Sequence, residues 1–335
     1  MIDFSTKNII DIFLGSKTIQ EGYYGTTLVY QKTQPEPEPY ITFKALASST
    51  IGLAKKSSNQ TLYYSTNGNT WSIMTTSTTL NISSGNKVYI RGNLYGDNTN
   101  TDYTKFTITG NVKVSGDINA LWNYSNLTAS LKKYCGFSLF SGCTGLTDAS
   151  RLKLSATILS DRCYYNMFNG CTALNAAPVI KSTTLASYCC SGMFLGCTSL
   201  TIAPNLNATT LAEHCYEAMF QNCSSLTTAP AILPATTLAD SCYNLMFSWC
   251  SRLIAAPELP AKTLVNNCYK QMFYSCARIN YIKCLATDIS ATDCTRFWCG
   301  NFLLTTIGTF VKDASMTSWT IGESGIPSNW TIQNA

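Results

Sequence analysis

The chain has 335 residues, of which only 12% are charged, and its formal net charge at neutral pH is +5. An average soluble domain carries about 25% charged residues, so Ser, Thr and Asn must supply most of the polar surface. The positive excess is small and forms no run, which argues against a nucleic-acid-binding protein.

The start of the sequence lacks a basic segment followed by an apolar core of about 7 to 15 residues. No apolar run approaches the roughly 20 residues of a membrane span. We therefore expect no membrane insertion and no export by the usual signal-peptide route. The length leaves room for two or three domains.

Residues 1–33 contain a small repeat, in which Phe13-Leu14-Gly15 recurs ten residues later as Tyr23-Tyr24-Gly25. Two strand–turn units with glycine at the turns predict a β-hairpin module that is too small to be stable alone. It resembles the short N-terminal segments of virion-attached proteins of Bacteroides phages, which implies an anchor; a simple β-cap on the next domain is the alternative. The candidate anchor residues are Phe13, Gly15, Tyr23, Tyr24, Gly25 and Tyr30.

Residues 34–39 are predicted to form a linker, in which proline alternates with glutamate after Gln34. Such a segment adopts extended polyproline geometry, at about 3 Å per residue, and acts as a semi-rigid spacer. A spacer favours an anchor over a cap for the preceding module.

Residues 40–120 are predicted to form an all-β, sandwich-like domain. Short segments rich in β-branched and aromatic residues are separated by turn signals such as Asn67-Gly68 and Gly85-Asn86. Short strands with turn signals every 8 to 12 residues or so are typical of a β-sandwich. The predicted strands are 41–46, 61–65, 70–74, 79–82, 87–92 and 103–110.

Residues 121–307 are dominated by a repeat of the form C-x-x-x-M-F-x-x-C, whose leading cysteines are 26 to 28 residues apart. A period of this length predicts a solenoid, in which each coil buries its apolar side against its neighbours. Residues 121–131 would cap its first coil. Residues 308–335 would form the C-terminal cap, sealed by Trp319, Ile326 and Trp330. The leading cysteines are Cys135, Cys163, Cys189, Cys215, Cys242, Cys268 and Cys294.

One helix and one strand are expected in each repeat. Leu238, Cys242, Met246 and Cys250 are four residues apart, as on one face of an α-helix. A segment of the form C-x-x-L-x-x-A-P follows and predicts a short strand with Leu and Ala inward, ended by proline. The prediction is an α/β solenoid of the leucine-rich-repeat type.

These repeats, for example CYYNMFNGCTALNAAP from residue 163, resemble the BspA-like leucine-rich repeats of surface proteins of gut Bacteroidetes and of their phages. The segments at 63–93 and 308–333 are similar to the β-domain and the ending of the same proteins. The resemblance covers roughly residues 40–335 and implies an interaction scaffold rather than a chemistry.

All 16 cysteines lie at or after Cys135. Cys242 and Cys250 would be roughly 12 Å apart on a helix, which is too far for a disulfide. The sequence has no C-x-x-C motif and no second histidine, so the spacing typical of a zinc site is absent. Ladders of buried thiols are favoured over disulfides or metal. The one histidine, His214, falls at a variable and therefore exposed position without a visible catalytic partner.

No acid–base pair and no phosphate-binding glycine loop is evident, so an enzyme, a cofactor and a metal are not expected. If the repeats have a specific binding function, its residues should lie at the positions where similar repeats differ. Exposed Trp and Tyr at such positions are of the types enriched at binding hot spots. The alternative is that these solvent-facing positions vary neutrally. The candidate binding face comprises Leu195, Gln221, Trp249 and Tyr274 after the Met-Phe pair and Thr201, Ile202, Ile254, Asn280 and Tyr281 on the strand.

The resulting hypothesis is a non-enzymatic phage virion protein, such as a head fibre, decoration or tail-associated protein. Its N-terminus would contact capsid or tail proteins, and its repeats would bind a host surface glycan or protein. A BspA-like adhesin on the bacterial surface and an intracellular scaffold or inhibitor are the alternatives. Homo-oligomerisation through residues 1–33 is a further expectation.

Overall fold

The structure, a computed structural model, describes residues 12–14, 17–19, 21–24, 27–31, 39–299 and 307–335. The chain divides into two compact units, Met1–Glu38 and Pro39–Ala335. The predicted linker falls outside the described residues except for Pro39.

The first unit contains two antiparallel strand pairs. Strand β1 (Ile12–Leu14) pairs with β2 (Lys17–Ile19), and β3 (Glu21–Tyr24) pairs with β4 (Thr27–Gln31). The two predicted pairs of short strands are therefore present, whereas the predicted glycine turns between them fall outside the described residues.

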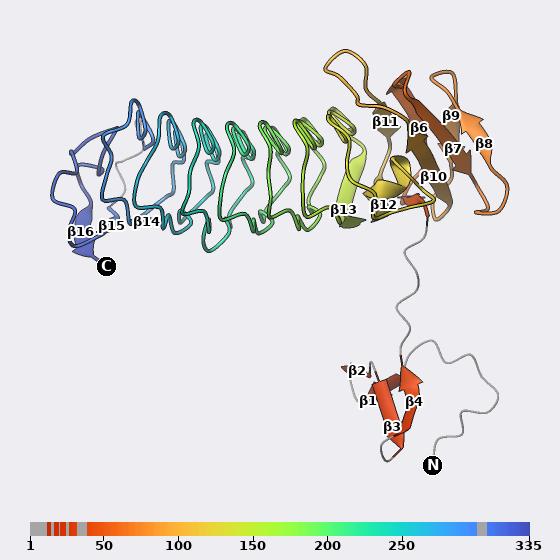
Figure 1. Cartoon of the computed structure of the whole chain (residues 1–335), viewed down its shortest axis with the longest axis horizontal. Helices are drawn as coiled ribbons and strands as arrows, with labels where there is room; N and C mark the ends of the chain where they lie inside the picture. Colours follow the sequence, from red (N-terminus) through yellow and green to blue (C-terminus); the bar gives the residue numbers. More distant parts are fainter. Residues whose placement is uncertain (1–11, 15–16, 20, 25–26, 32–38, 300–306) are drawn as a thin grey trace. The chain divides into compact units, whose positions relative to one another are not determined.

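The second unit begins with two sheets that pack face to face, here called the β-domain. A mixed six-stranded sheet has the order β13-β12-β5-β10-β7-β8, and a three-stranded sheet has the order β11-β6-β9 (Figure 1). Between them, Phe43 of β5 and Phe106 of β11 lie 5.5 Å apart, ring to ring. The strands are β5 (Ile41–Ala45), β6 (Ser49–Lys55), β7 (Gln60–Ser65), β8 (Ser72–Met74), β9 (Thr79–Ile82), β10 (Lys87–Leu94), β11 (Lys105–Thr109), β12 (Val112–Asp117) and β13 (Leu146–Lys153).

Burial along these strands alternates as expected for sheets with one face on a core. In β10, Val88 and Ile90 are buried, whereas Lys87 and Tyr89 on the opposite face retain exposed surface. The all-β prediction for this region is confirmed. Two strands, β6 and β12, were not predicted.

After the β-domain, the repeats form coils stacked side by side (Figure 1), but the helix predicted in each repeat is wrong. The only helical element among the described residues is a 3-10 helix, η1 (Ile118–Leu121). Where helices were expected, each coil carries a run of successive tight turns, here called the turn ladder. The turn ladders span residues 134–143, 162–171, 188–197, 214–223, 241–250, 267–276 and 293–299.

The hydrogen bonds of the turn ladder alternate between two directions. The amide of Cys242 donates to the carbonyl of Ala239, three residues back, whereas the amide of Tyr243 donates to Cys268 of the next coil (3.2 and 3.1 Å). The same alternation continues to Cys250. In an α-helix every amide would instead bond to the carbonyl four residues back within its own segment. Half of the amides in the turn ladder therefore donate hydrogen bonds to a neighbouring coil.

A residue in the left-handed region recurs at every fourth position of the turn ladder. In one coil these are Ser241, Leu245 and Trp249, with φ of 57°, 59° and 65°. A right-handed helix cannot include such residues. The period of four nevertheless turns Cys242, Met246 and Cys250 inward, all fully buried, as a helix would.

On the opposite side of each coil, most of the predicted strands are replaced by isolated β-bridges. Most neighbouring coils are joined there by isolated parallel bridges, such as Ile202 with Thr228 and Ala255 with Tyr281. Continuous parallel strands occur at the C-terminal end, in β14 (Tyr281–Cys284), β15 (Thr309–Lys312) and β16 (Thr331–Asn334). The predicted inward leucines are fully buried at Leu174, Leu200, Leu226 and Leu253.

One hydrophobic core runs through the β-domain and the coils, so the predicted boundary at residue 120 does not divide compact units. The ring of Phe106 stacks on Phe140 of the first coil at 5.5 Å. Equivalent phenylalanines then stack from coil to coil at 5.4 to 5.9 Å, in the order Phe140, Phe168, Phe194, Phe220, Phe247 and Phe273.

The two ends of the stack are closed in different ways. At the start, β13 belongs both to the first coil and to the edge of the six-stranded sheet, where it pairs in parallel with β12. The β-domain itself, rather than residues 121–131 alone, therefore covers the first coil. Gly145 permits this contact, because a Cβ there would lie 2.8 Å from the carbonyl carbon of Thr109. At the far end, Trp319, Ile326 and Trp330 are buried, as predicted, and Trp319 stacks on Trp298 at 5.5 Å.

Candidate binding surfaces

The first group of predicted binding residues lies at the end of the turn ladders. Trp249 has 51% of its surface exposed, and its ring meets that of Tyr274 in the next coil edge to face at 6.1 Å. Leu195 and Gln221 occupy the position equivalent to Tyr274 in earlier coils and are half-buried. Trp249 adopts a positive φ of 65°, which is uncommon for a bulky residue.

The second group lies on the strand side of the coils. Ile202, Ile254 and Tyr281 have 62%, 50% and 38% of their surfaces exposed, and Thr201 and Asn280 are also exposed. A shallow groove of about 750 Å³ runs along this side, with Ile202 and the exposed Val179 in its lining and no charged residue among its lining residues. The two groups therefore occupy two distinct positions of each coil.

The candidate anchor residues lie in the first unit. Phe13 belongs to β1, Tyr23 and Tyr24 belong to β3, and Tyr30 belongs to β4. Gly15 and Gly25 fall outside the described residues.

His214 was predicted to be exposed, but its side chain is partly buried and has a polar neighbour. Its Nδ1 lies 2.8 Å from a carboxylate oxygen of Glu217, and its ring stacks on Tyr188 with centroids 4.5 Å apart. Only 28% of the side chain is exposed. Residues three apart are neighbours on a helix as well as on the outer edge of a turn ladder, so the spacing of His214 and Glu217 was an available signal that the sequence reasoning did not use.

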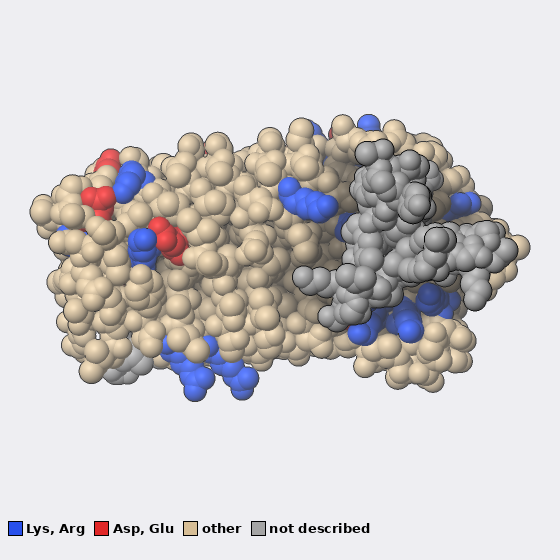
Figure 2. All heavy atoms as spheres, turned by 90° about the horizontal axis from the view of Figure 1, so that it is seen from below, with Lys and Arg blue, Asp and Glu red and all other residues tan. Residues whose placement is uncertain are grey.

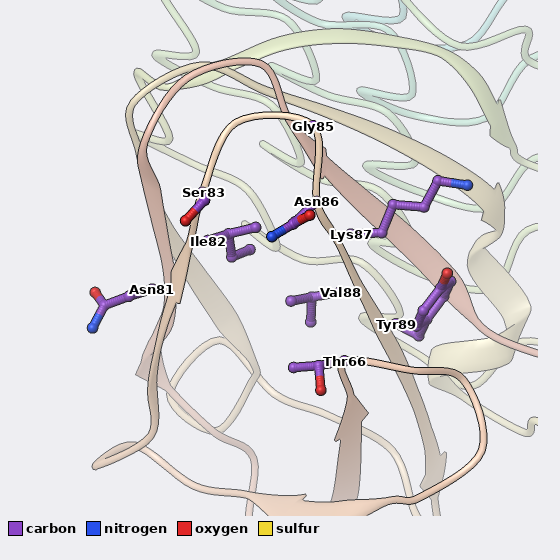
Figure 3. Close-up of a pocket in the computed structure, with 9 residues that line it drawn as sticks. All are labelled: Thr66, Asn81, Ile82, Ser83, Gly85, Asn86, Lys87, Val88 and Tyr89. Carbon is purple, nitrogen blue, oxygen red and sulfur yellow. The ribbon is translucent and has the colours of Figure 1, made fainter.

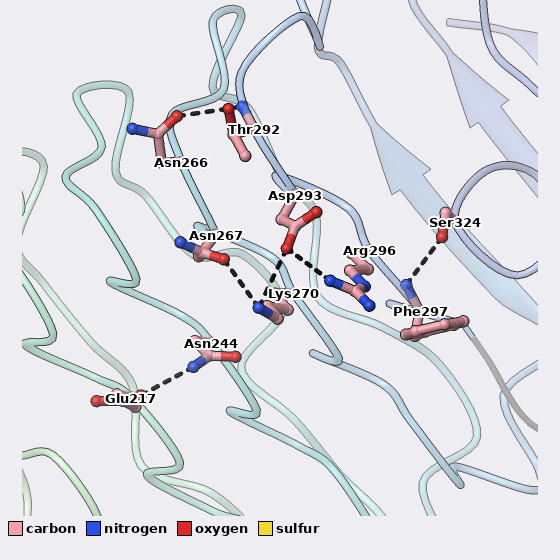
Figure 4. Close-up of polar contacts among 10 residues, drawn as sticks. All are labelled: Glu217, Asn244, Asn266, Asn267, Lys270, Thr292, Asp293, Arg296, Phe297 and Ser324. Atoms are coloured by element: carbon pink, nitrogen blue, oxygen red, sulfur yellow. Dashed lines mark hydrogen bonds and ion pairs between the residues drawn. The ribbon is translucent and has the colours of Figure 1, made fainter.

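Glu217 begins a row of polar contacts along that edge (Figure 4). Asn244 donates to Glu217 at 2.8 Å, and further along Asp293 pairs with Arg296 and Lys270 at 3.1 and 3.2 Å. Hydrogen bonds from Arg296 and Lys270 lower the pKa of Asp293 below its usual value. Exposed pairs of this kind contribute little to stability, so the row aligns neighbouring coils more than it stabilises them.

All 16 cysteines are free and buried. One series of thiols donates to the carbonyl of a phenylalanine in the preceding coil, as Cys197 does to Phe168 at 3.2 Å and Cys223 to Phe194 at 3.1 Å. Burial raises the pKa of Cys223 to about 12. Because the thiolate is the reactive form, these cysteines are structural and not nucleophiles.

A cavity of about 460 Å³ opens in the β-domain between β9 and β10. Ile82, Val88 and Thr66 lie around it, whereas Lys87 and Tyr89 point away, on the other side of β10 (Figure 3). No binding site is predicted in this domain from the sequence.

Comparison with known protein families, with curated proteins and with solved structures finds no match to this chain. Within the part of the chain that the structure describes, no helix has the length and apolar character needed to cross a bilayer.

Proposed function

We propose that this chain is a non-enzymatic virion protein of a phage, in which the unit of residues 39–335 is displayed for binding to the host surface. The observation that carries the proposal is the single core from Phe43 to Trp319. Such a core makes the stack rigid, and it holds exposed residues such as Trp249 and Ile202 at regular intervals. Rigid aromatic and aliphatic anchors bind with little loss of side-chain entropy.

At the level of fold, we propose that the stacked coils are a BspA-like leucine-rich-repeat solenoid in which turn ladders replace the helices. Support comes from the repeat period, from the inward Leu174 and its equivalents, and from the parallel bridges between coils.

We further propose that residues 1–33 attach the protein to the capsid or tail. These residues fall in a compact unit of their own, joined by a proline-rich segment to the displayed unit. Small β-modules gain core by association, which suits a docked anchor.

Deleting residues 1–39 should abolish incorporation into particles and leave the remaining unit folded, because the core of that unit begins at Ile41. Incorporation is measured by detecting the protein in purified particles, and folding by circular dichroism. Normal incorporation of the truncated chain would contradict the anchor and would favour a bacterial surface adhesin.

Replacing Trp249 and Tyr281 together by alanine should weaken binding to host cells by about tenfold or more, as expected for truncated aromatic hot spots. The matched control is Tyr95→Ala, since Tyr95 is 70% exposed but belongs to the β-domain. Equal cell binding by all three proteins would exclude the coils as the binding surface.

A further inference from the structure

The outer face of the six-stranded sheet, which points away from the three-stranded sheet, carries a row of lysines. Lys44 of β5 lies directly opposite Lys87 of β10 on one side and Lys113 of β12 on the other. All three are exposed. Like charges in directly opposite positions destabilise a sheet. Residues that destabilise the fold locally are expected at functional sites.

Little negative charge compensates this row. Lys113 pairs with Asp148 of β13 at 3.0 Å, but no carboxylate in the described part of the chain pairs with Lys44 or Lys87. In the view of Figure 2, Lys and Arg lie at the β-domain end as well as toward the opposite end, whereas the visible Asp and Glu lie mainly toward the opposite end. The mild net charge of the whole chain therefore conceals a local concentration of positive charge.

Arg91 lies on the same face, four residues beyond Lys87 along β10. Its guanidinium is held between two rings, with its central carbon 4.0 Å from the centroid of Trp71 and 4.3 Å from that of Tyr124. Its Nε is buried without a hydrogen-bond partner, and no carboxylate among residues 39–299 and 307–335 pairs with it. Stacking fixes the plane of the guanidinium, and the planar fork is suited to bidentate pairing with a carboxylate.

Half-exposed aromatic residues surround this arginine. Tyr63 is its cross-strand neighbour on β7 and lies 6.2 Å from Tyr124, ring to ring. Tyr89, between Lys87 and Arg91, meets the ring of Tyr40 at 4.9 Å. We call the whole surface the basic face, defined by Lys44, Lys87, Lys113, Arg91, Tyr63, Trp71, Tyr89 and Tyr124.

We propose that the basic face binds an acidic polysaccharide, with the carboxylate of one sugar paired to Arg91 and carboxylates of neighbouring sugars near Lys87 and Lys44. Arg91 and Lys87 are roughly 13 Å apart along the strand, at about 3.3 Å per residue. One monosaccharide is too short for that distance, so a ligand that reaches both Arg91 and Lys87 must contain several sugars. This site goes beyond the proposed function, and it depends neither on the virion assignment nor on the repeats.

A single-stranded nucleic acid is the competing polyanion, and the geometry disfavours it. Nucleic acids bind through aromatic rings whose faces are open to stacking bases. Here the guanidinium of Arg91 covers one face each of Trp71 and Tyr124, and Tyr40 lies 5.9 Å from Trp71. The rings therefore position the arginine rather than present themselves to bases.

The test uses the full chain and polygalacturonate as the probe, with neutral dextran and oligothymidylate for comparison. Polygalacturonate should bind, and the affinity should fall as salt rises, because exposed charges are screened. Arg91→Lys, which keeps the charge but loses the planar fork, should weaken binding by about tenfold. Lys44→Gln together with Lys87→Gln should weaken it by on the order of threefold.

The control is Lys132→Gln together with Lys133→Gln, which removes two exposed charges outside the basic face and should leave the affinity unchanged. Each variant is checked by circular dichroism, and the Lys44 and Lys87 pair removes only exposed charge, so the fold should persist. Equal affinity of all variants, or an equal loss in the control, would overturn the proposal. Tighter binding of oligothymidylate than of polygalacturonate would also overturn it, in favour of nucleic acid.

Discussion

The unit of residues 39–335 is expected to unfold cooperatively as the pH rises from about 9 to about 10.5. Burial raises the pKa to about 12 for the thiols of Cys143, Cys189, Cys215, Cys223, Cys276 and Cys284, from an ordinary value of 9.0. A thiol whose pKa is raised by folding stabilises the fold fully below its unfolded pKa. This stabilisation is lost as the pH rises towards the folded pKa.

The magnitude follows from the number of thiols. At pH 10, one pH unit above the unfolded pKa, each of these thiols lowers the free energy of unfolding by roughly 1.4 kcal/mol. Six thiols together lower the free energy of unfolding by roughly 8 kcal/mol, which is comparable with the total of about 5–15 kcal/mol for a typical fold. Burial also raises the pKa of Tyr164, Tyr216, Tyr243 and Tyr269 above the ordinary value, which acts in the same direction.

The measurement is a pH titration under reducing conditions, followed by circular dichroism and by the ultraviolet absorbance of thiolates. Both signals should change in one transition, and the native spectrum should return at neutral pH. Thiolate absorbance that rises near pH 9 while the circular dichroism stays native would mean that the thiols ionise in the folded protein, and the prediction would fail. As a control, iodoacetamide at pH 7 should label the unfolded chain and leave the native unit nearly unlabelled.

The sequence predicts the period of the coils, their inward residues and the all-β region, but not the local backbone of the repeat. Residues at positions i and i+4 share one face in an α-helix and also in the turn ladder, so the burial of Cys242, Met246 and Cys250 fits both. The distinguishing signals were weak. An ideal helix has a period of 3.6, whereas this repeat keeps a strict four, and Gly142, Gly170 and Gly196 stand at a position with positive φ. Ordinary residues at equivalent positions, such as Trp249, hide that signal.

The residues of the proposed binding surfaces were only partly accessible to sequence reasoning. Positions that vary between repeats identified the exposed Ile202 and Trp249, because variation marks solvent exposure. The basic face was missed, since Lys44, Lys87 and Lys113 come from three separate segments and meet only through the strand order β12-β5-β10. The strands β6 and β12 were missed as well. Gly52 in β6 and Gly116 in β12, the latter at a φ of 97°, interrupt the pattern of each strand.

Replacing Phe194 by alanine should lower the free energy of unfolding by about 3 to 5 kcal/mol, the usual cost of truncating a buried phenylalanine. Phe194 is fully buried, and its ring stacks on Phe168 and Phe220 at 5.4 and 5.5 Å, nearly parallel to both. In a stack of coils, stability is close to a sum of terms between neighbours, so a cavity at this ring weakens two interfaces together. The expected result is a lower denaturant midpoint and a broader transition.

Leu195 provides the matched control, because it is adjacent in the chain but half-buried on the outer edge of the same turn ladder. Leu195→Ala should cost about 1 kcal/mol or less. Phe194→Leu, which keeps part of the volume but loses the ring stacking, should fall between the two. If Phe194→Ala and Leu195→Ala unfold at the same denaturant concentration, the stacked phenylalanines do not couple the coils. The β-domain and the far end of the stack would then unfold independently, which the continuous core from Phe43 to Trp319 argues against.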